Sequence, residues 1–81
     1  MKNLNNVVVD RLNKYLNQFR LTQYKLAELS GVPFATIKSI MQRRTKTINL
    51  KTIILLSYGL GIKPCEFIND DSFLANNINL D

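Results

Sequence analysis

The segment from Leu21 to Arg44 constrains the fold more than any other part of the chain. Thr22 is a residue type that caps helix N-termini, and Ser30-Gly31 supplies a glycine that can end a helix. Pro33 suits the first turn of a second helix, where its missing N–H is not needed. Between these signals apolar residues recur at helical spacing, at Leu26, Ala27 and Leu29 and again at Ile37, Ile40 and Met41. The segment therefore predicts two short helices joined by a tight turn.

The second of these helices leaves an outward face that is small and nearly uncharged. Its outward positions are Ala35, Ser39 and Gln42, with Thr36 and Lys38 on the flanks and Phe34 on the shoulder nearest the core. Positive charge follows directly, at Arg43, Arg44 and Lys46. A close-fitting face followed by cations suits a groove with negatively charged walls. Taken alone, the three cations would fit a solvated turn better than a phosphate site, and their position directly after this helix reverses that preference.

Motifs related to this helix pair extend along most of the chain. They are Thr22-Gln23, Leu26-Ala27, Gly31-Val32, Thr36-Ile37, Leu50 with Thr52, Leu60-Gly61-Ile62 and Glu66-Phe67. In these motifs residues 12–68 resemble the phage-repressor/Cro-type (xenobiotic response element) helix-turn-helix family of DNA-binding proteins. The resemblance implies an all-α fold, a compact five-helix bundle of the lambda-repressor-like type whose helix-turn-helix is formed by helices 2 and 3. It places a DNA-binding domain at residues 1–69, followed by a tail at residues 70–81.

The resemblance implies sequence-specific binding of double-stranded DNA, as a bacterial or phage transcription regulator of repressor type. The helix at residues 34–42 would read the major groove. Base contacts are expected from Phe34, Ala35, Thr36, Lys38 and Ser39, and phosphate contacts from Thr22, Gln23, Gln42, Arg43, Arg44 and Lys46. No Arg or Asn faces outward within this helix, so apolar contact with thymine methyl groups predicts an A·T-rich site. Family members usually pair on DNA, and a homodimer is expected.

Four positions depart from the family pattern. Leu16 and Met41 are apolar where family members often carry an Arg and a Glu that form an ion pair between helices, and a well-packed apolar pair can replace such a pair without loss. Arg43 stands where the family usually has glycine, and Ile48 stands where it usually has proline. A non-glycine residue in a left-handed helix cap costs about 1 kcal/mol. Either Arg43 takes that strained conformation, or the helix before it ends differently.

The flanking segments supply the other helices. Asn5 or Asn6 is expected to cap a first helix that runs to Phe19, and Asn49 and Gly61 are expected to bound a fourth. The residues expected to face the core are Val8, Val9, Leu12, Tyr15, Leu16 and Phe19 in the first helix, Leu50, Ile53, Ile54, Leu56 and Leu60 in the fourth, and Phe67 in a short fifth helix after Pro64.

The tail carries four apolar residues among loop-forming Asn and Asp. They are Phe73, Leu74, Ile78 and Leu80. Apolar side chains of this size need cover, either from this chain or from a partner. We therefore expect the tail to pack on the domain or to form the contact of the homodimer.

Composition narrows the classes of function. Ten basic residues and a single acidic one, Glu28, lie between Arg11 and Lys63, within a net charge of +5, which favours a polyanionic partner. The chain has no histidine and one cysteine, and its few carboxylates lie on the tail or at helix ends rather than paired in a pocket, so no enzyme activity, metal site or cofactor is expected. No signal peptide or membrane-length apolar run is present, so no membrane contact and a cytoplasmic location are expected.

Two alternatives involve a protein partner. The same fold serves as an adaptor or oligomerisation module, and an antitoxin binds both its toxin and DNA. An adaptor has no need of basic residues gathered around helix 34–42. Surface charge around that helix therefore discriminates between the alternatives.

Overall fold

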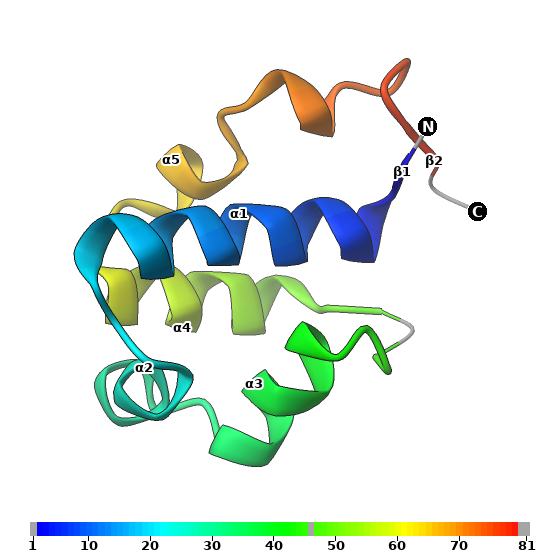
Figure 1. Ribbon diagram of the computed structural model, residues 1–81. Helices are drawn as coiled ribbons and strands as arrows, with labels where there is room; N and C mark the ends of the chain where they lie inside the picture. The colour runs from blue at the N-terminus through cyan, green and yellow to red at the C-terminus, as the bar shows by residue number, and fades with distance from the viewer. Residues whose placement is uncertain (1, 46, 80–81) are drawn as a thin grey trace.

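The computed structural model describes residues 2–45 and 47–79, and this part of the chain is mostly helical, as expected. Its elements are β1 (Lys2–Asn3), α1 (Leu4–Phe19), α2 (Gln23–Ser30), α3 (Phe34–Met41), α4 (Leu50–Leu60), α5 (Pro64–Ile68), the 3-10 helix η1 (Asp71–Phe73) and β2 (Ile78–Asn79). Figure 1 shows α1 and α4 side by side and running in the same direction. The α2 and α3 helices lie on one side of this pair, and α5 lies on the other. None of the described helices has the length and apolar character needed to cross a membrane.

A parallel pair of two-residue strands, which the sequence did not predict, joins residues 2–3 to residues 78–79. The side chain of Asn3, the last residue of β1, accepts a hydrogen bond from the Asn6 backbone amide at 2.9 Å. Asn3 has the extended backbone conformation that an N-cap requires. The expectation that Asn5 or Asn6 caps α1 is therefore wrong, because strand pairing fixes the extended residue earlier in the chain.

The other helix ends follow the sequence signals. Thr22 and Asn49 cap α2 and α4 with their side chains, as expected. Gly31 and Gly61 adopt left-handed conformations, with φ of 77° and 74°, where these helices end. Local residue chemistry therefore explains both boundaries of α2 and both boundaries of α4.

The hydrophobic core is continuous across the helices. It contains Val8, Val9, Leu12, Leu16, Leu26, Val32, Ile37, Ile40, Ile53, Leu56, Leu60 and Phe67. Three residues expected to face it are instead exposed: Leu50 by 69%, Ile54 by 37% and Phe19 by 39%. The α4 helix is apolar around most of its circumference, but only its sides toward α1, α2 and α5 are covered. The expectation was wrong for Leu50 and Ile54 because sequence spacing did not distinguish the two sides.

The tail packs against its own domain. The Phe73 ring lies 6.4 Å from the ring of Phe67, centroid to centroid, and Ile78 in β2 is buried. Leu74 is 53% exposed, and Leu80 lies outside the described residues. Two of the four apolar tail residues are thus covered, at least in part, by this chain.

Candidate nucleic-acid interface

The α3 helix is anchored by one side and exposed on the other. Ile37 and Ile40 are buried in the core, with 0% and 2% exposure. The residues on the remaining surface that are exposed are Phe34, Ala35, Thr36, Lys38 and, at the end of the helix, Gln42. Four of the five residues expected to contact bases therefore lie on an accessible face.

Ser39, the fifth of these residues, is half-buried rather than fully outward. Its carbonyl accepts a hydrogen bond from the Arg44 amide, and the Ile40 carbonyl accepts one from the Arg43 amide. These two bonds form a Schellman motif, which folds the chain back over the end of α3. The outward line of the helix therefore runs through Ala35, Lys38 and Gln42.

Arg43 occupies the left-handed position of this motif, with φ of 59°. Of the two possibilities that the sequence left open, the strained conformation is the one adopted. Arg20 occupies the same position at the end of α1, with φ of 54°. Both arginines stand where glycine would be free of strain.

The Arg43 side chain turns back toward α1 rather than standing free. Its Nε donates to Asn6 Oδ1 at 2.7 Å, and one terminal nitrogen lies 3.6 Å from Asp10 Oδ1. The side-chain amide of Asn5 also donates to the carbonyl of Thr45. The first turns of α1 thus hold the loop after α3 in place. A phosphate that bound Arg43 would have to share its guanidinium with Asp10. Arg44 is also exposed. Lys46 lies outside the described residues.

The N-terminus of α2 lies next to the start of α3. Thr22 accepts from the Lys25 amide at 3.0 Å, and Gln23 is half-buried at the first helical position. The Tyr24 ring packs edge-on against the Phe34 ring, with centroids 5.7 Å apart and planes inclined by 64°. The N-terminus of α2, which is expected to bind phosphate, and the start of α3, which is expected to contact bases, therefore lie together and are joined by two aromatic rings.

Charge is strongly biased over α3, the following loop and α4. The sequence from residue 33 to residue 63 contains six basic residues and no acidic one: Lys38, Arg43, Arg44, Lys46, Lys51 and Lys63. On α2, Glu28 lies 3.2 Å from Lys25, which balances that charge locally. A polyanion that approached α3 would therefore meet no carboxylate along this segment.

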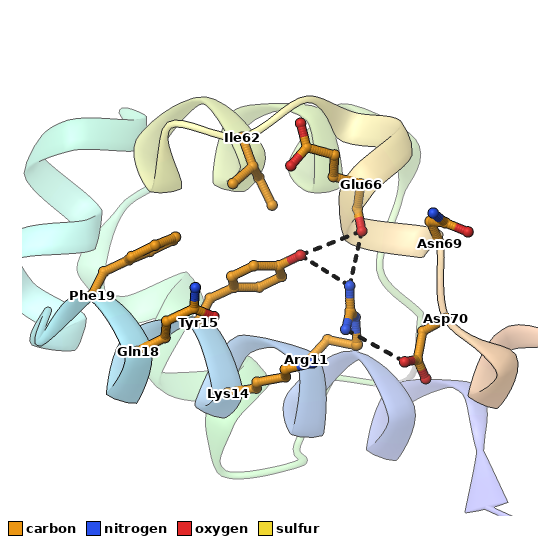
Figure 2. Close-up of a pocket in the computed structure, with 9 residues that line it drawn as sticks. All are labelled: Arg11, Lys14, Tyr15, Gln18, Phe19, Ile62, Glu66, Asn69 and Asp70. Carbon is orange, nitrogen blue, oxygen red and sulfur yellow. Dashed lines mark hydrogen bonds and ion pairs between the residues drawn. The ribbon is translucent and has the colours of Figure 1, made fainter.

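A shallow pocket of about 400 Å³ lies on the α5 side of α1 (Figure 2). Arg11 forms its floor and is 6% exposed. Arg11 Nε donates to the Phe67 carbonyl at 2.9 Å and one terminal nitrogen donates to the Glu66 carbonyl at 2.8 Å, while the guanidinium also contacts Tyr15 and Asp70. Arg11 thus ties α1 to α5 through Nε and one terminal nitrogen, and its other terminal nitrogen lies 3.6 Å from Asp70 Oδ1.

Asp70 belongs to the same cluster of polar groups. The Ser72 hydroxyl and the Ser72 amide both donate to its carboxylate, and these hydrogen bonds lower the pKa of Asp70. The positive charges of Arg11 and Lys14 lower this pKa further. Asp70 is therefore held as a carboxylate beside Arg11. The described residues contain no cluster of three or more cysteines or carboxylates that could hold a metal ion.

Sequence reasoning missed two residues of these surfaces. Arg11 lies three residues after Val8 and four before Tyr15, within the apolar stripe of α1, and that placement was the available signal. Tyr24 had no comparable signal, because its partner Phe34 belongs to another helix.

Comparisons of the chain with protein-family models, curated protein sequences and solved structures give no match.

Proposed function

We propose that the protein binds double-stranded DNA in a sequence-dependent manner, with α3 in the major groove, as a transcription regulator of repressor type. The observation that carries this proposal is the exposed outer side of α3, which bears a cation, Lys38, but no carboxylate, and which continues into a segment without carboxylates. The arrangement of α2, turn and α3 suits a helix-turn-helix within a lambda-repressor-like bundle, and the sequence resemblance supports the same assignment. Because fold alone does not define function, it is this face of α3 that supports DNA binding.

The roles of individual residues follow from their placement. Lys38 is the cation on the exposed face of α3 and would reach guanine, while Ala35 and the Thr36 methyl group would contact thymine. Arg44 would bind phosphate, and Arg43 would contribute less because it already contacts Asp10. Gln23, at the N-terminus of α2, would meet phosphate where the helix end attracts anions.

A salt titration tests the proposal. Binding of duplexes selected from a random pool should weaken with salt, and the slope of log K against log[salt] should be about 0.9 per phosphate contact. Arg44→Ala should flatten that slope by about one unit without changing the preferred sequence. Lys14→Ala, on the α5 side of the molecule, is the matched control and should leave the slope unchanged. A slope near zero for the wild-type protein would contradict DNA binding.

A second candidate is a protein–protein module, and the exposed side of α4 favours it. Leu50, Ile54 and Tyr58 are 69%, 37% and 77% exposed and follow one another at intervals of four residues, which places them in one stripe. Antiparallel pairing with a second copy would place Ile54 opposite itself and Leu50 opposite Tyr58. The homodimer contact is therefore better sought on α4 than on the tail.

Sedimentation velocity distinguishes these surfaces. Ile54→Arg should abolish self-association if α4 is the contact, whereas Leu74→Arg should abolish it if the tail is. Self-association without any DNA binding would favour the adaptor. Capture of both DNA and a second protein would fit an antitoxin.

A further inference from the structure

The Tyr24–Phe34 pair differs from the other aromatic pairs of the described residues. In each of the other pairs at least one ring is buried or half-buried, whereas Tyr24 and Phe34 are 62% and 41% exposed. Their edge-to-face contact holds the two rings against each other across the α2–α3 turn. The pair thus forms a short aromatic ridge with a defined shape on the surface.

The ridge lies outside the hydrophobic core. Leu26, Val32 and Ile37 belong to the buried core cluster, whereas neither Tyr24 nor Phe34 is among its residues or among the partly buried residues packed against it. The two rings therefore present apolar surface to the solvent rather than to the core. Aromatic surface that packing does not require is characteristic of contact sites.

The position of the ridge determines which part of a DNA duplex it would contact. Tyr24 follows Gln23 at the N-terminus of α2, and Phe34 is the first residue of α3. In a helix-turn-helix complex the first of these ends faces the phosphate backbone and the second enters the major groove. A tyrosine combines an apolar ring with a hydroxyl donor, so it can contact both environments.

We propose that Tyr24 and Phe34 act as one unit that recognises thymine by its C5 methyl group, with the Tyr24 hydroxyl donating to a neighbouring phosphate. This inference rests on the proposed DNA-binding function and adds a residue and a chemical target to it. Thymine is the one base that presents a methyl group in the major groove, and aromatic side chains contact it favourably. Phe34 touches the methyl group, and Tyr24 fixes the orientation of Phe34.

Replacement of thymine by uracil tests the proposal, because it removes only the methyl group. The probe is the duplex recovered by selection from a random pool, with deoxyuridine placed at one thymine position at a time. Wild-type protein should lose affinity by about four-fold at the position under the ridge, the factor that corresponds to burial of one methyl group. Phe34→Ala and Tyr24→Ala should bind the two duplexes equally. Tyr24→Phe should keep the discrimination while binding both duplexes more weakly.

Phe19→Ala is the matched control, because Phe19 also forms a ring pair at 5.7 Å and is 39% exposed, but it lies at the end of α1. It should retain wild-type discrimination. If the wild-type protein binds both duplexes equally but with a steep salt dependence, the ridge proposal fails while the proposed function stands. If both alanine variants retain the preference for thymine, the methyl group is read elsewhere and the ridge proposal fails. Absence of any DNA binding overturns both.

Discussion

A β-carbon on Gly59 would lie 2.7 Å from the β-carbon of Ser30, closer than such atoms approach in proteins. The absence of a side chain at Gly59 therefore sets the spacing between α4 and α2. The same added atom would lie 2.9 Å from a methyl carbon of Leu26 and 3.0 Å from the Ser30 α-carbon. Because backbone atoms cannot rotate away, a side chain at Gly59 must push the two helices apart.

We therefore expect Gly59→Ala to destabilise the protein. Overpacking of this kind costs about 1–3 kcal/mol, and the better helix propensity of alanine offsets up to ~1 kcal/mol of that. Urea denaturation should show a net loss in the free energy of unfolding. Lys51→Ala, at an exposed position of α4, is the control and should change stability by less than about 0.5 kcal/mol. An alanine variant at Gly59 that is as stable as the wild type would contradict the close approach.

Arg11 should matter for stability rather than for DNA binding. Arg11→Met leaves the Phe67 carbonyl without its side-chain donor, at about 1–3 kcal/mol for this buried group. The Glu66 carbonyl loses one donor but keeps the Asn69 amide and the Tyr15 hydroxyl. Arg11→Lys should restore little, because an ammonium group cannot reproduce the forked geometry of a guanidinium. Chemical denaturation measures both variants, with Lys14→Met at an exposed site of the same helix as the control. Wild-type stability of Arg11→Met would show that these hydrogen bonds contribute nothing net.

Arg20 and Arg43 both have positive φ, so the effects of replacing each of them by glycine can be compared directly. Arg20→Gly should stabilise the protein by about 1 kcal/mol, because glycine adopts positive φ without strain. Arg43→Gly gains the same relief but loses the hydrogen bond to Asn6, worth about 0.5–1.5 kcal/mol. Thermal unfolding should therefore show a higher midpoint for Arg20→Gly and little change for Arg43→Gly. Equal gains at both sites would show that the bond to Asn6 is not formed in solution.

Asp70 should make stability depend on pH in the acidic range. Its pKa is lowered in the folded protein, so its contribution is fully present above the ordinary aspartate pKa near ~4 and is lost as pH falls through the lowered value. Ser72→Ala removes the hydroxyl donor, which is the strongest cause of the shift, but keeps the Ser72 amide, so the pKa of Asp70 should rise and this pH dependence should become smaller. Carboxyl chemical shifts measured by NMR during an acid titration report that pKa. An unchanged titration of Asp70 in Ser72→Ala would assign the shift to the backbone amide of residue 72 and to Arg11 and Lys14 instead.

Lys38 should influence which sequence is bound. Lys38→Ala should relax the preference at one base pair, worth about 1–3 kcal/mol. Ala35→Glu, by contrast, should abolish binding because it places bulk and negative charge on the exposed side of α3. Selection of sites from a random pool measures both effects. A sharply defined G·C-rich consensus that Lys38→Ala leaves unchanged would show that another face enters the groove.

Features determined by neighbouring residues could be predicted from the sequence. The caps at Thr22 and Asn49 and the ends at Gly31 and Gly61 depend on interactions within one turn of helix, so residue type was sufficient. The strain at Arg43 was one of two alternatives that followed from the same reasoning.

Features determined by distant residues could not be predicted. Asn3 caps α1 because β1 pairs with β2, far along the chain. Arg11 donates to the carbonyls of Glu66 and Phe67, more than fifty residues away. Leu50 and Ile54 were misplaced because α4 is apolar around most of its circumference, and only the position of its neighbours decides which side is covered. On the candidate site, Tyr24 was missed because its significance arises from contact between two helices.

The pairing of β1 with β2 brings the two ends of the described chain together. Paired strands lie about 4.8 Å apart, so a short flexible linker from residue 79 to residue 2 would close the backbone into a ring. Opening that ring at the exposed turn around Lys63 would give a circular permutant in which α1 follows the tail directly. The strand pairing, which now closes a very long loop, would become a local contact. The order of elements along the chain is therefore separable from their arrangement in space, and α3 would keep its exposed face in either order.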